Sequence, residues 1–323
     1  CWNKENLERR GMKPPLTWED LADPAYENQL AVSDPTKSGT VAAMFECILQ
    51  IGMAKAAGSQ PATPESMAAG WLDGLSQIRR IGANARYWTD SSTKIPLDVA
   101  EGEALAGMCV DFYGRNLVER LNKVNGQSRL GFLSPHGGTT ISPQPVAMFR
   151  GAPNPELATR FIEFLISPEG QKLWGLKAGS PGGPEKMALR SMPLRQDYYV
   201  AGILLYAADP ELRPLDPGEA FVYEPKYTSE LFSAIRFLIR AMCIDPHVEL
   251  KQAWHELIAN QFPPEATAAF EQLDGVDYAS VKARIAPVLK AKDPVATAAL
   301  AREISEHFRQ SYLKARDLAR AGK

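Results

Sequence analysis

Hydrophobic and polar residues change their pattern most clearly between residues 30 and 57. A short apolar segment at 30–34 has the length and composition of a β-strand. A polar turn that contains Pro35 and Gly39 follows it. From residue 40 to residue 57 the apolar positions have the spacing of a helix. The pattern therefore predicts a strand, a short turn and a helix in direct succession.

The same succession of elements continues as far as residue 195. Thr63 and Pro64 are typical of a helix start, and Pro168 interrupts a long helical region. Strands that alternate with helices are typical of a layered α/β fold. The predicted strands are 85–88, 105–112, 129–133 and 146–149, and the predicted helices are 64–81, 95–102, 116–123 and 154–176.

The pattern changes after about residue 195. Prolines between residues 210 and 225 indicate an irregular connector. Beyond Ser229 the periodicity predicts helices only, with an apolar stripe that includes Phe232, Ile235 and Ile239. We interpret this part as an all-helical extension that covers the α/β core, and docking of a partner is the alternative. The predicted helices are 229–243, 246–260, 263–272, 277–290 and 294–320.

Composition and charge restrict the classes of function. The 323 residues are enough for two or more lobes, and 45% hydrophobic and 23% charged residues are ordinary for a globular protein. A net charge of −2 argues against nucleic acid or an anionic membrane as the main partner. No apolar run has the length of a membrane span, so no spanning helix is expected. Cys1, Cys47, Cys109 and Cys243 have no metal-binding spacing, and we expect small buried hydrophobes among them.

The sequence carries no recognisable catalytic motif. It has no dinucleotide-binding glycine loop, no phosphate loop with its lysine, no zinc-protease helix motif and no nucleophile elbow. His136, Gly137 and Gly138 are faintly similar to an esterase oxyanion loop, but no nucleophile accompanies them. We therefore predict a binding protein. The alternative is an enzyme on an α/β scaffold, which would need His136, Asp111 and Tyr113 close together.

The turn before the helix at residue 40 could hold a ligand without any catalytic side chain. The first amides of a helix have no partner within the helix, and they carry the positive end of its dipole. Such a helix start attracts anions and polar ligand groups. The alternative is an ordinary capped helix, with Ser38 or Thr40 as the capping residue.

Several phrases stand in a fixed order between residues 14 and 184. They are PLTWEDLADP at 15–24, AVSDP at 31–35, SGT at 38–40, VAEGE at 99–103, GAPNP at 151–155 and SPEGQ at 167–171. Together they resemble bacterial extracellular solute-binding proteins of ABC importers, in particular the ferric-iron type with the type II periplasmic binding fold. The resemblance implies a receptor that closes two α/β lobes over its ligand without catalysis.

The resemblance also implies an organisation of the chain. Residues 1–134 would form most of the second lobe, and residues 135–199 would return to the first lobe, whose N-terminal part lies outside this sequence. Residues 200–323 would form the C-terminal helical region, packed on the first lobe. The family further implies a periplasmic or extracellular location and an ABC permease as partner. It allows a membrane anchor in a segment before Cys1.

Ligands of such folds lie where loops meet at the ends of strands, and three loops are expected to meet here. The first offers hydroxyls and helix-start amides, the second follows the predicted strand 105–112, and the third lies where the chain would cross between lobes. The candidate ligand-binding residues are Lys37, Ser38, Gly39 and Thr40 in the first loop, Asp111, Tyr113 and Arg115 in the second, and His136, Gly137, Gly138 and Thr139 in the third.

Two classes of ligand are compatible with these loops. Ferric-iron members use two adjacent tyrosines, whose phenolate oxygens are hard donors for a hard cation. This chain has Phe112 and Tyr113 there, so Tyr113 is the candidate metal ligand, and strand alternation would turn Asp111 and Phe112 to opposite faces. Arg115 offers a two-pronged contact to phosphate or carboxylate, unless it forms a structural ion pair. We expect a small anionic organic solute, with ferric iron as the alternative transported ligand and no cofactor.

Overall fold

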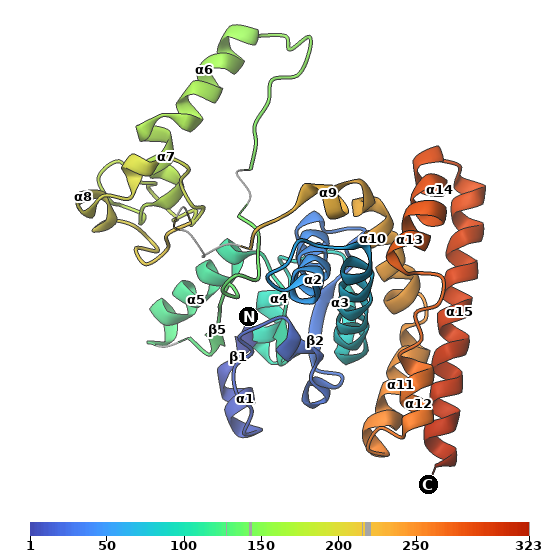
Figure 1. Ribbon diagram of the computed structural model, residues 1–323. Helices are drawn as coiled ribbons and strands as arrows, with labels where there is room; N and C mark the ends of the chain where they lie inside the picture. The colour runs from blue at the N-terminus through green and yellow to red at the C-terminus, as the bar shows by residue number, and fades with distance from the viewer. Residues whose placement is uncertain (127, 142–143, 215, 217–220, 323) are drawn as a thin grey trace.

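The computed structural model of the chain describes residues 1–126, 128–141, 144–214, 216 and 221–322. A five-stranded sheet lies near the centre of the molecule (Figure 1). In spatial order its strands are β3 (Ala85–Thr89), β2 (Leu30–Ser33), β4 (Ala106–Gly107), β1 (Trp2–Asn3) and β5 (Leu130–Gly131).

All strands of this sheet except β1 point in the same direction. β2 pairs in parallel with β3 on one side and with β4 on the other. β1 is antiparallel to both β4 and β5, so β5 has the direction of β4. The C-terminal ends of β2, β3, β4 and β5 therefore lie along one edge of the sheet. Helices and loops that follow these strands begin at that edge.

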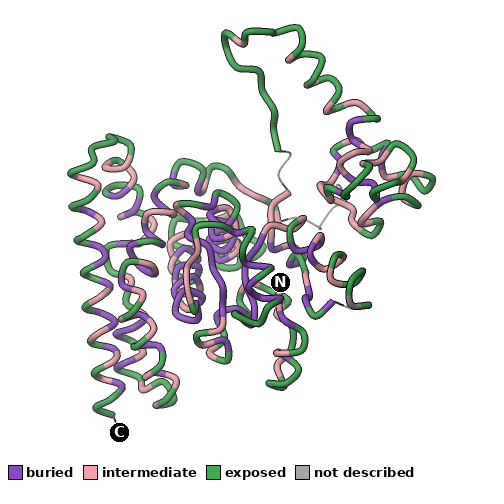
Figure 2. The backbone as a smooth tube through the Cα atoms, turned by 180° about the vertical axis from the view of Figure 1, so that it is seen from behind, coloured by how far each residue is buried: buried purple, intermediate pink, exposed green. Residues whose placement is uncertain are grey.

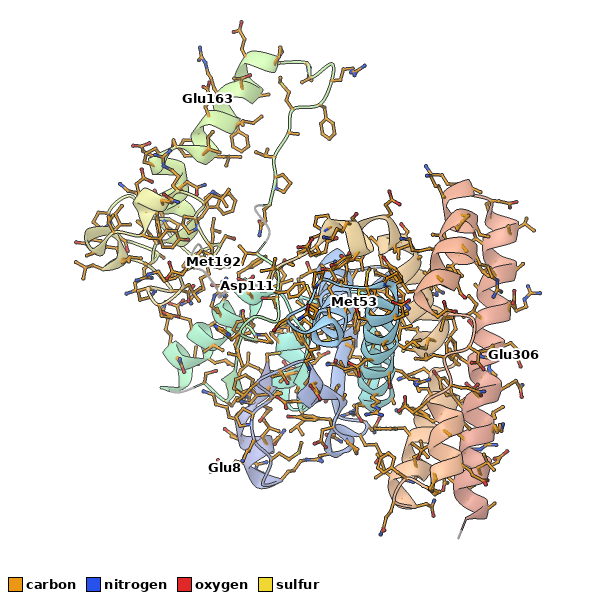
Figure 3. The ribbon with its side chains drawn as sticks, in the orientation of Figure 1. Glu8, Met53, Asp111, Glu163, Met192 and Glu306 are labelled. Atoms are coloured by element: carbon orange, nitrogen blue, oxygen red, sulfur yellow. The ribbon has the colours of Figure 1, made fainter. Side chains whose placement is uncertain are left out.

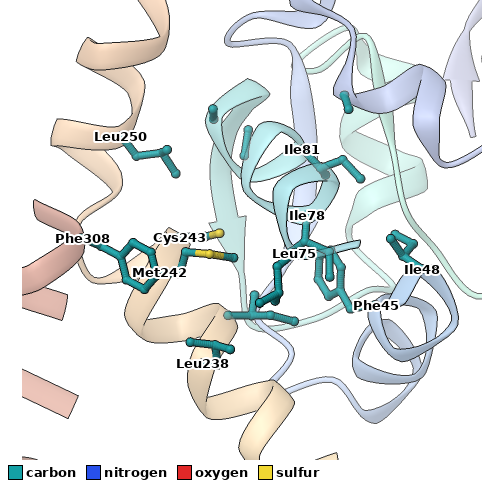
Figure 4. Close-up of a cluster of buried hydrophobic side chains, with 14 of the residues drawn as sticks. Phe45, Ile48, Leu75, Ile78, Ile81, Leu238, Met242, Cys243, Leu250 and Phe308 are labelled. Carbon is teal, nitrogen blue, oxygen red and sulfur yellow. The ribbon is translucent and has the colours of Figure 1, made fainter. Parts of the chain in front are cut away.

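Two long helices, α2 (Gly39–Ala57) and α3 (Pro64–Asn84), pack closely beside the sheet. Their backbones touch, because a Cβ on Gly70 would lie 2.4 Å from the carbonyl oxygen of Gly52. Phe45 and Ile48 of α2 and Leu75 of α3 belong to the main hydrophobic core (Figure 4). Both helices were predicted from the sequence, and both predictions are confirmed.

By length and composition, α2 could cross a membrane, and it is the one such helix among the described residues. The expectation that no apolar run reaches this length was therefore wrong for α2. However, 56% of the apolar window of α2 is buried inside the protein. Packing against α3 accounts for this apolar character.

The predicted strand 105–112 is wrong. Only Ala106 and Gly107 form β4, and α5 (Asp111–Asn125) begins four residues later. Asp111 places a carboxylate in the first turn of α5, where the positive end of the helix dipole favours it. Asp111 and Phe112 thus share a helical turn, and strand alternation does not apply to them. The other short elements around the sheet are α1 (Lys4–Arg9), α4 (Ile95–Glu101) and the 3-10 turns Glu19–Ala22 and Pro24–Tyr26.

Beyond residue 225 the described elements are all helical, as predicted, with bounds that differ by a few residues. The long α15 forms the outer side of the molecule (Figure 1). The elements are α9 (Pro225–Thr228), the 3-10 turn Ser229–Leu231, α10 (Phe232–Ile239), α11 (His247–Ala259), α12 (Pro264–Phe270), α13 (Tyr278–Ser280), α14 (Ala286–Ala291) and α15 (Pro294–Ala321), with π-helical turns at Arg240–Ile244 and Val281–Ile285.

In the part of the chain that the structure describes, these helices pack on α3 and α2. The indole Nε1 of Trp71 in α3 donates to the carbonyl oxygen of Val276 at 2.9 Å. The guanidinium of Arg79, also in α3, is fully buried against Glu271, with 2.5 Å between Nη2 and Oε2. Within the described residues the helices thus cover α3, and the expected packing on the first lobe stays a prediction.

The outer surface of the C-terminal helices carries little exposed apolar area. In the described residues from 221 onward, the large hydrophobic side chains that are strongly exposed are Val222, Val248, Phe262 and Val295, which lie in separate segments. A docking face would present a contiguous apolar patch. This arrangement supports the interpretation that the helices cover the core.

Residues 144–214 form a body that projects on the side opposite α15 (Figure 1). All twelve residues of α6 lie outside the buried class, and its apolar residues Leu157 and Phe161 are 61% and 57% exposed (Figure 2). The predicted strand 146–149 is wrong, since this segment has no strand partner and Phe149 is 89% exposed. The elements of the body are α6 (Pro155–Ile166), α7 (Pro168–Gly175), the 3-10 turn Gln196–Tyr198 and α8 (Ala201–Leu204).

Candidate functional site

A hollow of about 1690 Å³ opens at the C-terminal edge of the parallel strands. The start of α2 after β2, the loop after β3, the start of α5 after β4 and the loop after β5 all line it. The opposite wall comes from the projecting body, including Trp174 and Met192. Ligands of open α/β sheets bind outside the carboxyl ends of the strands, so this hollow is the candidate site.

The structure brings residues of all three predicted loops to this hollow. Some of the candidate residues do not line it themselves but stand next to residues that do. Those that line it are Gly39, Thr40, Asp111, Tyr113, Arg115, His136 and Thr139, and those that do not are Lys37, Ser38, Gly137 and Gly138. Their part in ligand binding stays a prediction.

The start of α2 presents free amides to the hollow. Ser38 is the N-cap residue, and its Oγ accepts a hydrogen bond from the amide of Val41 at 3.4 Å. Gly39 and Thr40 are exposed at the first turn, and within the described part of the chain their amides have no hydrogen-bond partner. Both readings of this turn therefore hold at once: Ser38 caps the helix, and two amides remain available.

A residue of the C-terminal helices holds the turn before α2 in place. Arg236 of α10 donates from Nε to the carbonyl oxygen of Pro35 and from Nη2 to that of Thr36, each at 2.7 Å. The carboxylate of Asp34 accepts the amide of Thr36 at 2.7 Å within the turn. These contacts fix the direction in which the first amides of α2 point.

The first turn of α5 contributes aromatic surface and one phenol. The rings of Phe112 and Tyr113 lie 4.4 Å apart between centroids, and Tyr113 is partly exposed. A search for groups of three histidine, cysteine or acidic residues that could hold a metal finds none in the described residues. A role for Tyr113 as a metal ligand therefore rests on the sequence resemblance and stays a prediction.

Arg115 is held by protein carboxylates. Its Nη2 donates to Asp111 Oδ2 at 2.5 Å and to the carbonyl oxygen of Arg190 at 2.8 Å. Its Nε lies 3.3 Å from Asp209 Oδ2. Arg190 in turn contacts Asp209 and donates from Nη2 to Glu119 Oε2 at 2.7 Å. The structural ion pair, one of the two sequence interpretations of Arg115, is thus present, and anion binding by Arg115 stays a prediction.

The carboxylates of this cluster differ in how well they are stabilised as anions. Burial raises the pKa of Asp209, although Arg115 and Arg190 act in the opposite direction. Burial also acts to raise the pKa of Glu119, but hydrogen bonds from Lys123 and Arg190 lower it overall. Asp209 is therefore the less stabilised of these two carboxylates.

The loop after β5 is tied to the N-terminal part of the chain. Trp18 donates from Nε1 to the carbonyl oxygen of Gly138 at 2.7 Å. In the described residues no hydrogen bond joins His136, Asp111 and Tyr113. The close set of acid and base groups that an enzyme would require is therefore not seen between these three side chains.

The loop after β3 also contributes to the hollow, although no residue of it was predicted from the sequence. Ser92 and Thr93 line the hollow from this loop, and Ser92 is buried. A polar serine and threonine run between the predicted strand 85–88 and the predicted helix 95–102 was the available signal. The hollow also has apolar surface from Trp18 and Met44. Hydroxyls, amides and aromatic rings together can hold a small organic solute that is partly polar.

Comparison with known proteins gives one family assignment. The model of a family described as "Bacterial extracellular solute-binding protein" matches residues 1–198, which is more than half of the chain. The matched part contains the sheet, α2, α3 and α5, and most of the residues that line the hollow.

Curated relatives match the same part of the chain. Proteins from Salmonella typhimurium and Salmonella typhi, both named "Phosphoglycerate transport regulatory protein PgtC", are 26% identical over 203 residues, or 59% of this chain and 45% of theirs. An uncharacterised protein of Haemophilus influenzae is 26% identical over 172 residues, or 53% of this chain and 43% of its own. The chain thus spans less than half the length of these relatives.

Among solved structures, that of the periplasmic binding protein P5PA is similar to this chain. It is 17% identical, with a TM-score of 0.38 over 73% of this chain and 60% of that one.

Proposed function

This chain belongs to the bacterial extracellular solute-binding proteins, and we propose that it captures a small anionic organic solute in the hollow and leaves its bonds unchanged. The family supports a periplasmic or extracellular binding protein. The finer statements, on the ligand and on the transporter, are part of the proposal.

The observation that carries the proposal is the place of the hollow in the fold. It lies where four strands end together, and Gly39 and Thr40, whose amides have no partner in the described residues, line it at the positive end of a 19-residue helix. Such a helix start favours a negative charge on the ligand. Hydroxyls of Ser92 and Thr93 add neutral hydrogen-bonding groups from the neighbouring loop.

The names of relatives support an anion, and two cations of the lining could assist it. Lys4 and Arg213 line the hollow without an ion pair in the described part of the chain. Glu211 lines it without an ion pair as well, and Arg213 Nη1 donates to the carbonyl oxygens of Pro210 and Leu212. The names of the Salmonella relatives mention phosphoglycerate, an anion that carries both a phosphate and a carboxylate. We therefore propose a small phosphorylated or carboxylated solute as the ligand class, delivered to an ABC permease.

Ferric iron is the second candidate. Among the described residues that line the hollow, Tyr113 supplies the one phenol where the ferric-iron type has two, and Asp111 is paired with Arg115. One phenolate with one engaged carboxylate is a weak set of hard donors for a trivalent ion. This observation favours the organic anion.

Thermal unfolding of the 323-residue chain tests the proposal. We would add 3-phosphoglycerate, inorganic phosphate, uncharged glycerol or ferric citrate, and measure the Tm and then the Kd by calorimetry. A ligand at one hundred times its Kd should stabilise the folded state by about 2.7 kcal/mol. We expect a higher Tm with one of the anions and no change with glycerol. A shift with ferric citrate and not with citrate alone would favour iron, and no shift with any addition would contradict the proposal.

A further inference from the structure

Asp209 occupies a place that suits an anionic group of a ligand. One of its carboxylate oxygens contacts the guanidinium of Arg190, and the other lies 3.3 Å from Arg115 Nε. Both arginines and Asp209 line the hollow, and their side chains are 9–11% exposed. A carboxylate or phosphate that bridges two guanidinium groups makes the same kind of two-oxygen contact.

The contact between Asp209 and Arg115 is incomplete. Arg115 Nε is buried and has no hydrogen-bond partner in the described residues, because Asp209 Oδ2 is near but outside the direction of the N–H bond. Buried donors in proteins are nearly always paired, so an unpaired one at the wall of a hollow points to a missing acceptor. An anion that enters the hollow with better geometry could supply it.

The arginines do not depend on Asp209 alone. Without it, Arg115 keeps its 2.5 Å contact with Asp111, and Arg190 keeps its 2.7 Å contact with Glu119. Lys123 also contacts Glu119, and Glu211 is a further negative group near Asp209. An anion in place of Asp209 would again give each arginine a second acceptor.

Arg190 has an unusual backbone for its residue type. Its φ is +58°, in the left-handed region that non-glycine residues rarely adopt. Such strain persists where the surroundings hold it, and it often marks binding sites and switches. Figure 3 labels Asp111 and Met192, which stand at the two sides of this contact between α5 and the projecting body. The strain at Arg190 supports a functional role for the contact.

Resting on the proposed function, we propose that Asp209 is a built-in counter-anion. It pairs with Arg115 and Arg190 before the solute binds. A phosphate or carboxylate group of the bound solute then takes its place between the two arginines. The replacement makes and breaks ion pairs and hydrogen bonds only. Asp209 lies outside the segment matched by the family model.

Calorimetry with inorganic phosphate and 3-phosphoglycerate tests this inference on three forms of the chain. They are the wild type, Asp209→Asn and Glu163→Gln, the last being a matched loss of one negative charge on exposed α6 of the same body (Figure 3). Suppose that Arg115 and Arg190 are released from Asp209 in about one wild-type molecule in ten. Asp209→Asn removes this competition, so it should lower the Kd for the anion about tenfold. Glu163→Gln should stay within about twofold of the wild type, because Glu163 is exposed on α6 without an ion pair in the described residues, and salt screens interactions of exposed charges.

The outcomes separate the inference from the proposed function. Suppose that the wild type binds an anion, but Asp209→Asn binds it no more tightly than Glu163→Gln does. This result overturns the inference and leaves the proposed function intact. No binding of either anion by any form overturns both. Because Asp209→Asn could unfold, Arg115→Gln gives a second test, in which anion affinity should fall at least tenfold. Unchanged affinity in folded Arg115→Gln, checked by circular dichroism, also overturns the inference.

Discussion

Gly39→Pro would remove a single amide hydrogen from the start of α2 and leave the helix intact. Gly39 is the first residue of α2, where proline is well tolerated, and a Cβ there would meet no other atom within 4 Å. A proline also requires an extended residue before it, and Ser38 already has φ −115° and ψ 109°. The matched control is Gly39→Ala, which adds a Cβ at the same place but keeps the amide.

The magnitude follows from the role proposed for this amide. A hydrogen bond to a charged group contributes about 1.5–3 kcal/mol. Its loss would raise the Kd for an anion about 10- to 150-fold. Both substitutions replace a flexible glycine at a compatible position, so each should stabilise the folded chain by about 0.4–1 kcal/mol. Gly39→Pro should therefore bind the anion less tightly while it unfolds at a higher temperature.

Two measurements on each variant decide this prediction. Calorimetry with the anion that stabilises the wild type gives the Kd, and circular dichroism gives the Tm without ligand. Weak binding in Gly39→Pro together with near-normal binding in Gly39→Ala is the expected result. Equal affinity in the two variants, with both folded, would refute the argument that the helix start holds the charge of the ligand.

Three further predictions concern stability. Glu271→Gln should cost about 3–5 kcal/mol in urea unfolding, because it leaves the fully buried guanidinium of Arg79 without its carboxylate. Gly70→Ala should cost about 1–3 kcal/mol, since its Cβ would overlap the carbonyl oxygen of Gly52, and an unchanged unfolding midpoint would show that α2 and α3 can move apart. Burial lowers the pKa of His247 to about 4. The unfolded chain then binds the proton more readily, so stability should fall by up to about 3 kcal/mol between pH 6.5 and pH 4. His247→Gln should flatten this part of the pH dependence, and an unchanged slope in urea unfolding would contradict it.

The sequence allowed prediction of those elements whose signals are local. The start of α2 was predictable because Ser38 is a good cap and a long apolar pattern follows it directly. The beginning of α5 was missed because the apolar run before it is short, and short runs do not separate strand from helix. Asp111 and Arg115, spaced four residues apart, form an ion pair typical of a helix, and this spacing was the overlooked signal.

The candidate site was only partly predictable, because only some of its features have a local signal in the sequence. The three loops were found because strand ends and polar turns are visible in the sequence. The partners of Arg115 were not, since Asp209 is 94 residues away along the chain and no local pattern joins them. The position of the C-terminal helices also depends on distant contacts, such as Trp71 with Val276. Tertiary contacts of this kind decide which cation is free and which is neutralised.

The bond from Arg236 to the turn before α2 links the segment matched by the family model to the helices that follow it. The family match ends at residue 198, but the guanidinium that holds the carbonyl oxygens of Pro35 and Thr36 comes from beyond it. A chimaera that joins the first 198 residues to the helices of a distant homologue would thus inherit the binding loops without their support. A substitution at Arg236 would therefore act on the binding loop from outside the hollow, through the carbonyl oxygens of Pro35 and Thr36.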